Sequence, residues 1–394
     1  MSNASKWIDV PSLNALSREQ REVYSYSLDS NLIINGAAGS GKTILALMRA
    51  MQLVKKNKKV LFITYTKILH QFTLIAAQGH GLEVGRDIDI EYTSEMAKKV
   101  FGRHMASLEN ISDSMVERLV NKMGGYDAVI IDEGQDFSIS VFQRIFKRLG
   151  NVHTVCCDDK QSLYETDFTR EMVQRVYEPI KDKNLDFTYR NPKKIAQTSM
   201  GFFMKKFESM APVDEDITLK VYNEYNGAAT MIHSINEIQT IVKLIKNRAE
   251  NTVGILLPNN QAVKMITDSL SVGGIGTVEY KYYINGGGGN TCNFSTLNPK
   301  IMTYHSAKGI QFDSVIIPLL SNNYETDLWF SNTPEEARAF YVAMTRAKKN
   351  LYFIHPEDPL CPYTDFIPKQ FIKTKQVGEN RARTIDDIFD FGDD

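Results

Sequence analysis

The sequence predicts an α/β fold with two domains in tandem, each built around a mainly parallel sheet. Short apolar runs of strand length alternate with segments in which apolar residues recur at helical spacing, a pattern typical of parallel α/β architecture. The runs divide into a set before about residue 165 and a set after about residue 184. Polar clusters follow six of the runs, at the strand ends where open α/β sheets bind their ligands.

Nine apolar runs are expected to be strands: residues 31–35, 58–64, 126–131, 152–157, 184–189, 251–257, 299–304, 313–319 and 350–354. Helical spacing is clearest over residues 44–54, 93–101 and 236–249. We predict a first domain over residues 1–180 with a small insertion at about 75–122, a second domain over 181–375, and an acidic tail over 376–394.

The composition indicates an ordinary globular protein. The 394 residues suffice for two or three domains, and no apolar run reaches membrane-spanning length. The formal net charge is -1, so any binding of nucleic acid has to use a local groove. The four cysteines lack metal-ligand spacing, and we interpret Cys156 and Cys157 as reduced core residues. We expect a cytoplasmic protein without a membrane partner.

The stretch GAAGSGKT, residues 36–43, matches the phosphate-loop pattern between an apolar run and a helical segment. Glycines let the backbone amides turn inward, and the following helix N-terminus adds positive potential. A lysine at this position reaches the β- and γ-phosphates of ATP, and the next hydroxyl ligates Mg²⁺. The predicted nucleotide-binding residues of the loop are Gly36, Ala37, Ala38, Gly39, Ser40, Gly41, Lys42 and Thr43.

The stretch VIIDEGQD, residues 129–136, delivers three carboxylates to the end of one buried strand. Crowded carboxylates repel unless a cation lies among them, so a Mg²⁺ site is one interpretation, and a helix cap formed by Asp132 is another. The phosphate loop favours the first interpretation. Thr43 and Asp132 are then the predicted metal ligands, and Glu133 is the predicted general base for the attacking water.

Taken in order, the motifs resemble those of superfamily 1A helicases, the UvrD/Rep family. The resemblance spans residues 16 to about 354, and it implies two RecA-like domains that hydrolyse ATP in the cleft between them. Beside the phosphate loop, it is carried by LSREQREVY, DEGQD, DDKQSLY, LDFTYRNPKKIA, TYHSAKGIQFDSVIIP and EEARAFYVAMTRAKKNLYF.

The resemblance implies further nucleotide contacts by position in the motifs. Gln20 is expected to read the adenine edge, although SREQ also forms a capping-box pattern with Ser17, and both can hold. Tyr189 is expected to stack on the adenine, and Gln311 belongs to the predicted nucleotide contacts. Arg49 lies where the family has an arginine near the nucleotide, or is a surface cation of its helix.

The resemblance also implies catalytic roles. Gln161 is expected to sense the γ-phosphate, and Arg190 and Arg346 are expected to reach it from the second domain. Two arginines that cross a cleft would meet the charge of the transition state and couple hydrolysis to closure. The predicted catalytic residues are Lys42, Glu133, Gln161, Arg190 and Arg346.

Departures from the family pattern concern DNA binding. The two large accessory domains have little room, and the second is expected to be reduced to a loop over about 284–299. The stretch YETDF puts Glu165, Thr166 and Asp167 where the family has base-contacting residues, and acidic groups are poor neighbours for phosphates. Tyr65 can still offer a stacking face. His305 is expected to connect the nucleotide cleft to the DNA groove, or to be a buried core histidine.

Our first hypothesis is an ATP-dependent helicase or translocase on single-stranded DNA, with 3′ to 5′ polarity by resemblance and a 3′-tailed duplex as a further candidate substrate. The alternative is a regulatory or sensor DNA-dependent ATPase that partners a nuclease or another protein, for example in anti-phage defence, and unwinds little by itself. A kinase-like phosphoryl transferase is a third interpretation, which Glu133 and the two arginines disfavour. The implied cofactors are ATP and Mg²⁺.

Overall fold

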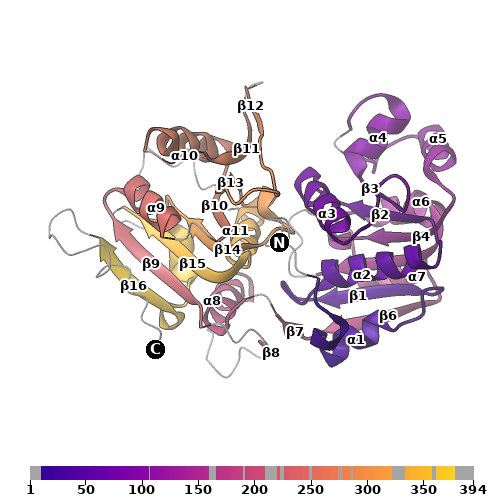
Figure 1. Cartoon of the computed structure of the whole chain (residues 1–394), viewed down its shortest axis with the longest axis horizontal. Coiled ribbons are helices and arrows are strands. Elements are labelled where there is room, and N and C mark those ends of the chain that lie inside the picture. Colours follow the sequence, from indigo (N-terminus) through magenta and orange to yellow (C-terminus); the bar gives the residue numbers. More distant parts are fainter. Residues whose placement is uncertain are drawn as a thin grey trace.

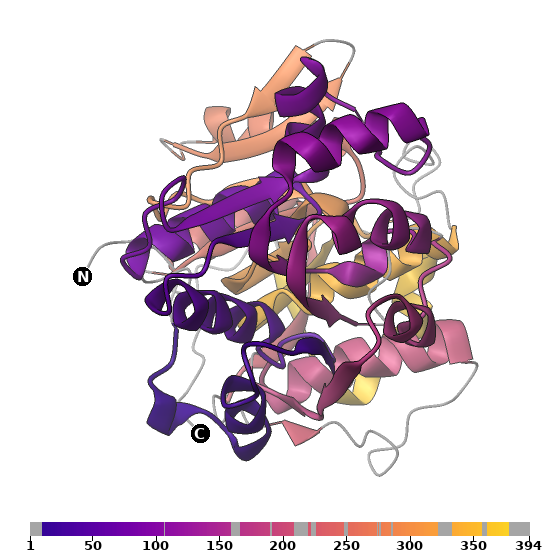
Figure 2. The ribbon, with the colours of Figure 1, turned by 90° about the vertical axis from the view of Figure 1, so that its right-hand side faces the viewer.

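The computed structural model describes residues 10–105, 107–158, 166–189, 191–208, 220–221, 226–247, 251–273, 275, 277–284, 287–321, 333–356 and 361–377. Within them, two sheets flanked by helices lie next to each other, one from each half of the chain (Figure 1). When the molecule is turned by 90°, the first half lies in front of the second (Figure 2). The predicted α/β fold with mainly parallel sheets is confirmed.

The first sheet has six strands in the order β3-β2-β4-β5-β1-β6, and its neighbouring strands are parallel. The strands are β1 (Asn31–Gly36), β2 (Val60–Thr64), β3 (Ile88–Tyr92), β4 (Tyr126–Ile131), β5 (Gly150–Cys157) and β6 (Ile180–Leu185). The helices of this half are α1 (Arg18–Tyr24), α2 (Lys42–Lys55), α3 (Lys67–Gly79), α4 (Thr93–Phe101), α5 (Asp113–Met123), α6 (Ile139–Arg144) and α7 (Arg170–Val176).

The second sheet has eight strands in the order β12-β11-β13-β10-β14-β15-β9-β16, and within the described strands only the pair β11–β12 is antiparallel. The strands are β9 (Ala228–Ser234), β10 (Val253–Leu257), β11 (Glu279–Ile284), β12 (Gly287–Asn290), β13 (Lys300–Thr303), β14 (Phe312–Ile317), β15 (Ala347–His355) and β16 (Ile372–Val377). The helices are α8 (Lys193–Phe203), α9 (Glu237–Lys246), α10 (Asn260–Val272) and α11 (Pro334–Met344). A short pair, β7 (Phe187–Thr188) with β8 (Lys220–Val221), follows β6.

Burial on both faces explains the continuous apolar runs of the central strands. Residues 129–131 of β4 and residues 32–34 of β1 are fully buried. A strand that is covered on both sides has no solvent face, so its sequence does not alternate between apolar and polar residues. Because the strands are parallel, their carboxyl ends meet at one edge of the sheet, and this edge carries the phosphate loop and the DEGQD stretch.

Several strands differ from those predicted, mostly where the sequence is polar. The expected strand 184–189 divides, because β6 ends at Leu185 and the short β7 follows. β6 lies at the edge of the first sheet and pairs with β1, so this sheet extends beyond the predicted division at residue 180. An edge strand faces solvent, which allows the polar sequence IKDKNL.

The two regions that we expected to be reduced insertions contain regular structure. Residues 75–122 supply β3, an edge strand of the first sheet, together with α4 and α5. Within the loop predicted at 284–299, β12 folds back on β11 as a hairpin at the edge of the second sheet. Of the predicted acidic tail, Gln376 and Val377 belong to β16, and the remainder lies outside the described residues.

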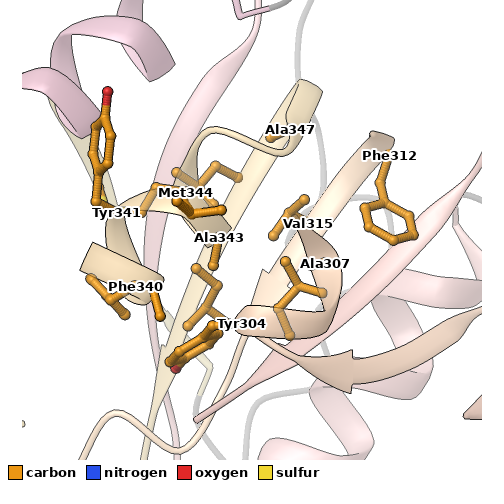
Figure 3. Packing of buried hydrophobic residues seen from close by; sticks show 14 of the residues in the cluster. Tyr304, Ala307, Phe312, Val315, Phe340, Tyr341, Ala343, Met344 and Ala347 are labelled. Carbon is orange, nitrogen blue, oxygen red and sulfur yellow. The ribbon is translucent and has the colours of Figure 1, made fainter. Parts of the chain in front are cut away.

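Helix α3 belongs to the packing of both halves. Ala76 and Ala77 join the core of the first half, whereas Ile68, Leu69 and Phe72 join the core of the second. The Phe72 ring meets Phe294 edge-on, with ring centroids 5.6 Å apart. The second core continues through Tyr304, Val315, Phe340 and their neighbours (Figure 3). The two halves therefore share an apolar contact in addition to the polar groups of the cleft.

Cys156, Cys157, Cys292 and Cys361 are buried free thiols, as expected for the first two. Among the described helices, none combines the length and the apolar character required to cross a bilayer.

Candidate active site

The phosphate loop joins the end of β1 to the start of α2 and is tightly folded. Gly39 and Gly41 have φ angles of 79° and 94°, which L-residues rarely adopt. A Cβ on Gly36 would lie 2.6 Å from Ser40 Oγ. The ammonium of Lys42 lies inside this fold and donates to Gly36 O at 2.6 Å and Ala37 O at 3.1 Å. The loop thus holds a buried cation beside the backbone that would receive a phosphate.

Thr43 and Asp132, the two predicted metal ligands, lie together. Thr43 Oγ1 donates to Asp132 Oδ2 at 2.8 Å. Burial, with a contribution from the Glu133 carboxylate, raises the pKa of Asp132 to about 7. Hydroxyl and carboxylate oxygens suit Mg²⁺, which keeps several waters and takes its other ligands from phosphates. Among the described residues, no group of three or more His, Cys, Asp or Glu side chains is arranged to hold a metal ion.

Glu133 occupies a left-handed backbone conformation, with φ 55° and ψ 45°. Such a conformation is strained for a residue other than glycine and is found mainly where the surroundings enforce it. The side chain is buried and accepts a hydrogen bond of 2.6 Å from Gln135 Nε2. Burial alone would raise the pKa of Glu133, but Lys308, Lys42 and Arg346 together lower it. The carboxylate is therefore held in the anionic form that a general base requires.

The third carboxylate of the stretch, Asp136, pairs with a cation from the other half of the chain. Lys308 Nζ lies 2.7 Å from Asp136 Oδ2 and 3.7 Å from Glu133 Oε2. Both Lys308 and Asp136 are almost fully buried. The three carboxylates at the end of β4 thus have distinct partners: the threonine hydroxyl, the glutamine amide and the lysine ammonium.

Replacing Asp136 with alanine is expected to destabilise the protein strongly, because it leaves the Lys308 ammonium buried without its closest carboxylate. Breaking a buried ion pair from one side typically costs about 3–5 kcal/mol, which for a chain of this size corresponds to a fall of roughly 4–6 °C in Tm. Circular dichroism during heating measures this. Lys264→Ala is the control, because its partner Asp268 is exposed and the pair is expected to contribute little. Equal Tm values for the two variants would contradict the prediction.

Arg346 faces the phosphate loop from the second half. Its guanidinium is almost fully buried, and its Nε and Nη2 atoms donate to Val342 O at 2.9 Å and Thr345 Oγ1 at 2.8 Å. Burial lowers the pKa of Arg346, and the Glu133 carboxylate partly offsets this. Arg346, Gln311 and Tyr189 line one cavity together with Gln20, Lys42, Thr43 and Glu133. The cavity brings together predicted residues that are far apart in the sequence.

Gln20 has two contacts that bear on its predicted role. Its Oε1 accepts from Ser17 N at 3.1 Å, which completes the capping box of α1. Its Nε2 donates to Ser40 O at 3.0 Å. Gln20 therefore links the start of α1 to the phosphate loop and also lines the cavity. Contact with adenine remains a prediction.

Arg49 is not brought to the cavity. Its guanidinium is buried and donates to Tyr26 O at 3.1 Å, Ser27 O at 2.6 Å and Thr154 Oγ1 at 2.9 Å. Nε, Nη1 and Nη2 of the guanidinium all have acceptors within the first half. Arg49 therefore neither lines the cavity nor lies at the surface, the two positions expected from the sequence. Gln161 and Arg190 lie outside the described residues.

The residues expected to face DNA have partners in their own half. Asp167 Oδ1 accepts from Ile139 N at 2.8 Å, and Thr166 Oγ1 donates to Gln135 O at 3.0 Å. Tyr65 packs edge-on against Phe137 with ring centroids 5.1 Å apart. Glu165 lies outside the described residues. Thr166 and Asp167 thus support the DEGQD loop and the start of α6.

Two charged residues at the site were not assigned from the sequence. Asp158 directly follows β5 and lies 3.6 Å from Lys42 Nζ, and its backbone N–H donates to Gln135 at 3.0 Å. Lys308 is the second. Both belong to polar clusters that follow apolar runs, so their position at the carboxyl end of a strand was the signal that could have identified them.

Fold and site define a phosphate-loop nucleotide-binding protein whose cavity lies between two parallel sheets. The sequence model of the DEAD/DEAH box helicase family matches residues 17–181, and that of the UvrD-like helicase C-terminal domain matches residues 293–358. Together with the DNA helicase II relatives described next, these matches support assignment to the UvrD/Rep-like group of superfamily 1 helicases, and the two mainly parallel sheets are consistent with tandem RecA-like domains.

Curated relatives are aligned over part of their length. The chain is 28% identical over 182 residues to DNA helicase II of Rickettsia typhi, which covers 42% of this chain and 26% of the relative. It is 44% identical over 62 residues to a probable DNA helicase II homologue of Mycoplasma pneumoniae, covering 14% and 8%. The chain therefore spans well under half of the curated relatives it matches.

Among solved structures, the helicase nonstructural protein 10 of an arterivirus is similar, with 13% identity and a TM-score of 0.42. The similarity covers 89% of this chain and 64% of the viral chain. It is too distant to refine the assignment.

Proposed function

We propose that the protein hydrolyses ATP between its two halves and uses the cycle to move along single-stranded DNA, as a helicase or translocase. The observation that carries the proposal is one cavity lined by Lys42, Thr43 and Glu133 of the first half and by Arg346 of the second. Phosphoryl transfer requires a phosphate cradle, a base and positive charge at the transition state, and this set supplies all three.

The residues divide these tasks. Lys42 and the loop amides hold the phosphates, and Glu133, anionic and fixed by Gln135, accepts the proton of the attacking water. Mg²⁺, held by Thr43 and Asp132, would neutralise charge on the β- and γ-phosphates. Arg346 stabilises the charge that develops on the transferred phosphoryl group. Because Arg346 comes from the other half, turnover depends on how the two halves are placed.

DNA as the partner and 3′ to 5′ movement rest on the family alone, whose named relatives here include DNA helicase II proteins. The second candidate, a regulatory ATPase that acts with a nuclease, is favoured by one observation. In the described part of the region where the family carries its second accessory domain, the chain forms the hairpin β11–β12 and returns to β13. The described residues of this region therefore do not form the large domain that is expected to grip duplex DNA.

We expect ATP turnover to be stimulated by single-stranded DNA, while unwinding of a 3′-tailed duplex by the protein alone stays weak. Thr166 and Asp167 are engaged within their own half, and each missing base–aromatic stack lowers strand affinity by roughly tenfold to a hundredfold. Remaining contacts to phosphates should make binding fall steeply with salt. Steady-state ATPase with and without strand, and unwinding at low and moderate salt, measure this.

Lys42→Ala is the control for both assays, because loss of the phosphate-binding ammonium should abolish any ATP-dependent signal. Efficient multi-turnover unwinding at moderate salt would reject weak unwinding and support an autonomous helicase. Unwinding or DNA cleavage that appears only with an added nuclease partner would support the second candidate. Absence of ATP turnover under all conditions would overturn the proposed function.

A further inference from the structure

The carbonyl groups of the phosphate loop are held from outside the loop. Thr188 Oγ1 donates to Ala38 O at 2.8 Å, and the Tyr189 N–H donates to Gly39 O at 2.9 Å. Together with the bond from Gln20 to Ser40 O, three successive loop carbonyls have donors from other segments. Two of these donors belong to the stretch that leads from the first half into the second.

These bonds orient the amide groups that would receive a phosphate. In a trans peptide the C=O and N–H groups point in opposite directions. When Thr188 holds the carbonyl of Ala38, the N–H of Gly39 therefore points away from Thr188. Gly39 lines the cavity, and inward-facing loop amides are the donors that bind phosphates. Thr188 is nearly fully buried, so water does not compete with Ala38 O for its hydroxyl.

Asn191, three residues further on, holds the loop that carries the arginine. Its Nδ2 donates to Thr345 O at 3.1 Å and to Ala347 O at 2.7 Å, the carbonyls on either side of Arg346. Asn191 is also nearly fully buried. Ala347 begins β15 and belongs to the core of the second half (Figure 3). Asn191 thus fixes both flanks of Arg346 relative to a rigid strand.

We propose that Thr188 and Asn191 are positioning residues for the nucleotide reaction. Thr188 holds the phosphate loop, Asn191 holds the Arg346 loop, and three peptide steps separate them, a span of at most about 11 Å. This short connector sets where the arginine lies relative to the phosphoryl group. The inference rests on the proposed ATP hydrolysis and adds two residues that are absent from the lining of the cavity.

The test uses steady-state ATPase of the full chain with Mg²⁺. Thr188→Val removes the hydroxyl and keeps the shape, and Asn191→Leu removes both donors. Because a displacement of about 1 Å in a reacting group can lower turnover by about a hundredfold, we expect kcat to fall tenfold to a hundredfold with little change in KM. Thr188→Ser retains the hydroxyl and is expected to restore turnover.

Matched controls lose the same kind of bond elsewhere. Thr267 on α10 donates its hydroxyl to Val263 O at 2.7 Å, so Thr267→Val mimics the loss at Thr188. Asn31, at the start of β1, donates Nδ2 to Tyr177 O at 2.8 Å and Pro179 O at 3.2 Å, so Asn31→Leu mimics the loss at Asn191. Both controls are expected to lower Tm and to leave kcat unchanged.

A double-mutant comparison separates positioning from general damage. In an Arg346→Ala background, Asn191→Leu should lower kcat little further, because the group that it positions is already absent, whereas Thr188→Val should still lower kcat, because the phosphate loop that it holds remains. Additive losses for Asn191→Leu with Arg346→Ala, or kcat values of the single variants equal to those of the controls, would overturn the inference. Should one variant fail to fold by circular dichroism, the other decides alone by comparison with its own control. Lack of turnover in the wild type would overturn the proposed function and this inference with it, whereas turnover that neither variant alters would overturn the inference only.

Discussion

Replacing Glu133 with glutamine is expected to lower kcat for ATP hydrolysis by about two to four orders of magnitude while nucleotide binding persists, because a positioned base contributes about that much. The carboxylate is buried, anionic and hydrogen-bonded to Gln135, and glutamine has the same shape. Single-turnover hydrolysis measures the chemical step, and equilibrium titration with a fluorescent ATP analogue measures binding.

The contrast with Lys42→Ala makes this prediction specific. That variant removes the ammonium that lies against Gly36 O and Ala37 O, so it is expected to lose binding as well as turnover. If Glu133→Gln retained nearly wild-type kcat, Glu133 would not be the base. If it lost binding as Lys42→Ala does, the variant would report damage to the site instead.

Replacing Arg346 with alanine is expected to lower kcat by about a thousandfold or more and to change the affinity for ATP far less. An arginine that meets the transferred phosphoryl group acts mainly on the transition state. The geometry supports this, because Arg346 lines the same cavity as Lys42 and Glu133, and its guanidinium is held by Val342 and Thr345 at the C-terminal end of α11. Steady-state kinetics and nucleotide titration measure both quantities.

Arg49→Ala is the matched control, since Arg49 is a buried arginine bonded within the core of the first half and does not line the cavity. It is expected to lower Tm and to leave the turnover of the folded protein unchanged. A rise in KM without a fall in kcat for Arg346→Ala would make Arg346 a ground-state contact and would reject the coupling of turnover to the placement of the halves.

The central strands and the phosphate loop could be predicted because their sequence signals are local. Burial on both faces produces the apolar runs of β1 and β4, and the glycines of residues 36–41 meet a backbone requirement within the same stretch. The sequence also predicted that Thr43 and Asp132 lie together, because the carboxyl ends of parallel strands meet at one edge of the sheet. The roles of these residues in catalysis stay predictions.

Other features depend on tertiary contacts that no local pattern contains. The edge strands β6 and β16 are polar, so they do not stand out from helices and loops. Arginine side chains are mostly exposed, yet the guanidinium of Arg49 is buried and donates a hydrogen bond to Thr154 of β5. The bonds of Thr188 and Asn191 join residues about 150 positions apart in the chain, and a hydroxyl or an amide alone does not indicate its acceptor.

Sharing α3 between the two cores has a consequence for how the protein responds to temperature. If the halves came apart at α3, Ile68, Leu69 and Phe72 would enter water, at about 1.5–3 kcal/mol for each side chain, or roughly 5–9 kcal/mol in all. That amount is comparable to the stability of a whole domain. Exposure of apolar surface also raises the heat capacity. The free-energy cost of opening the cleft widely would therefore be similar to that of partial unfolding. Rotations of the halves that keep α3 in place avoid this cost. Because apolar contacts weaken on cooling, this contact between the halves loosens in the cold while the hydrogen bonds of the active site persist.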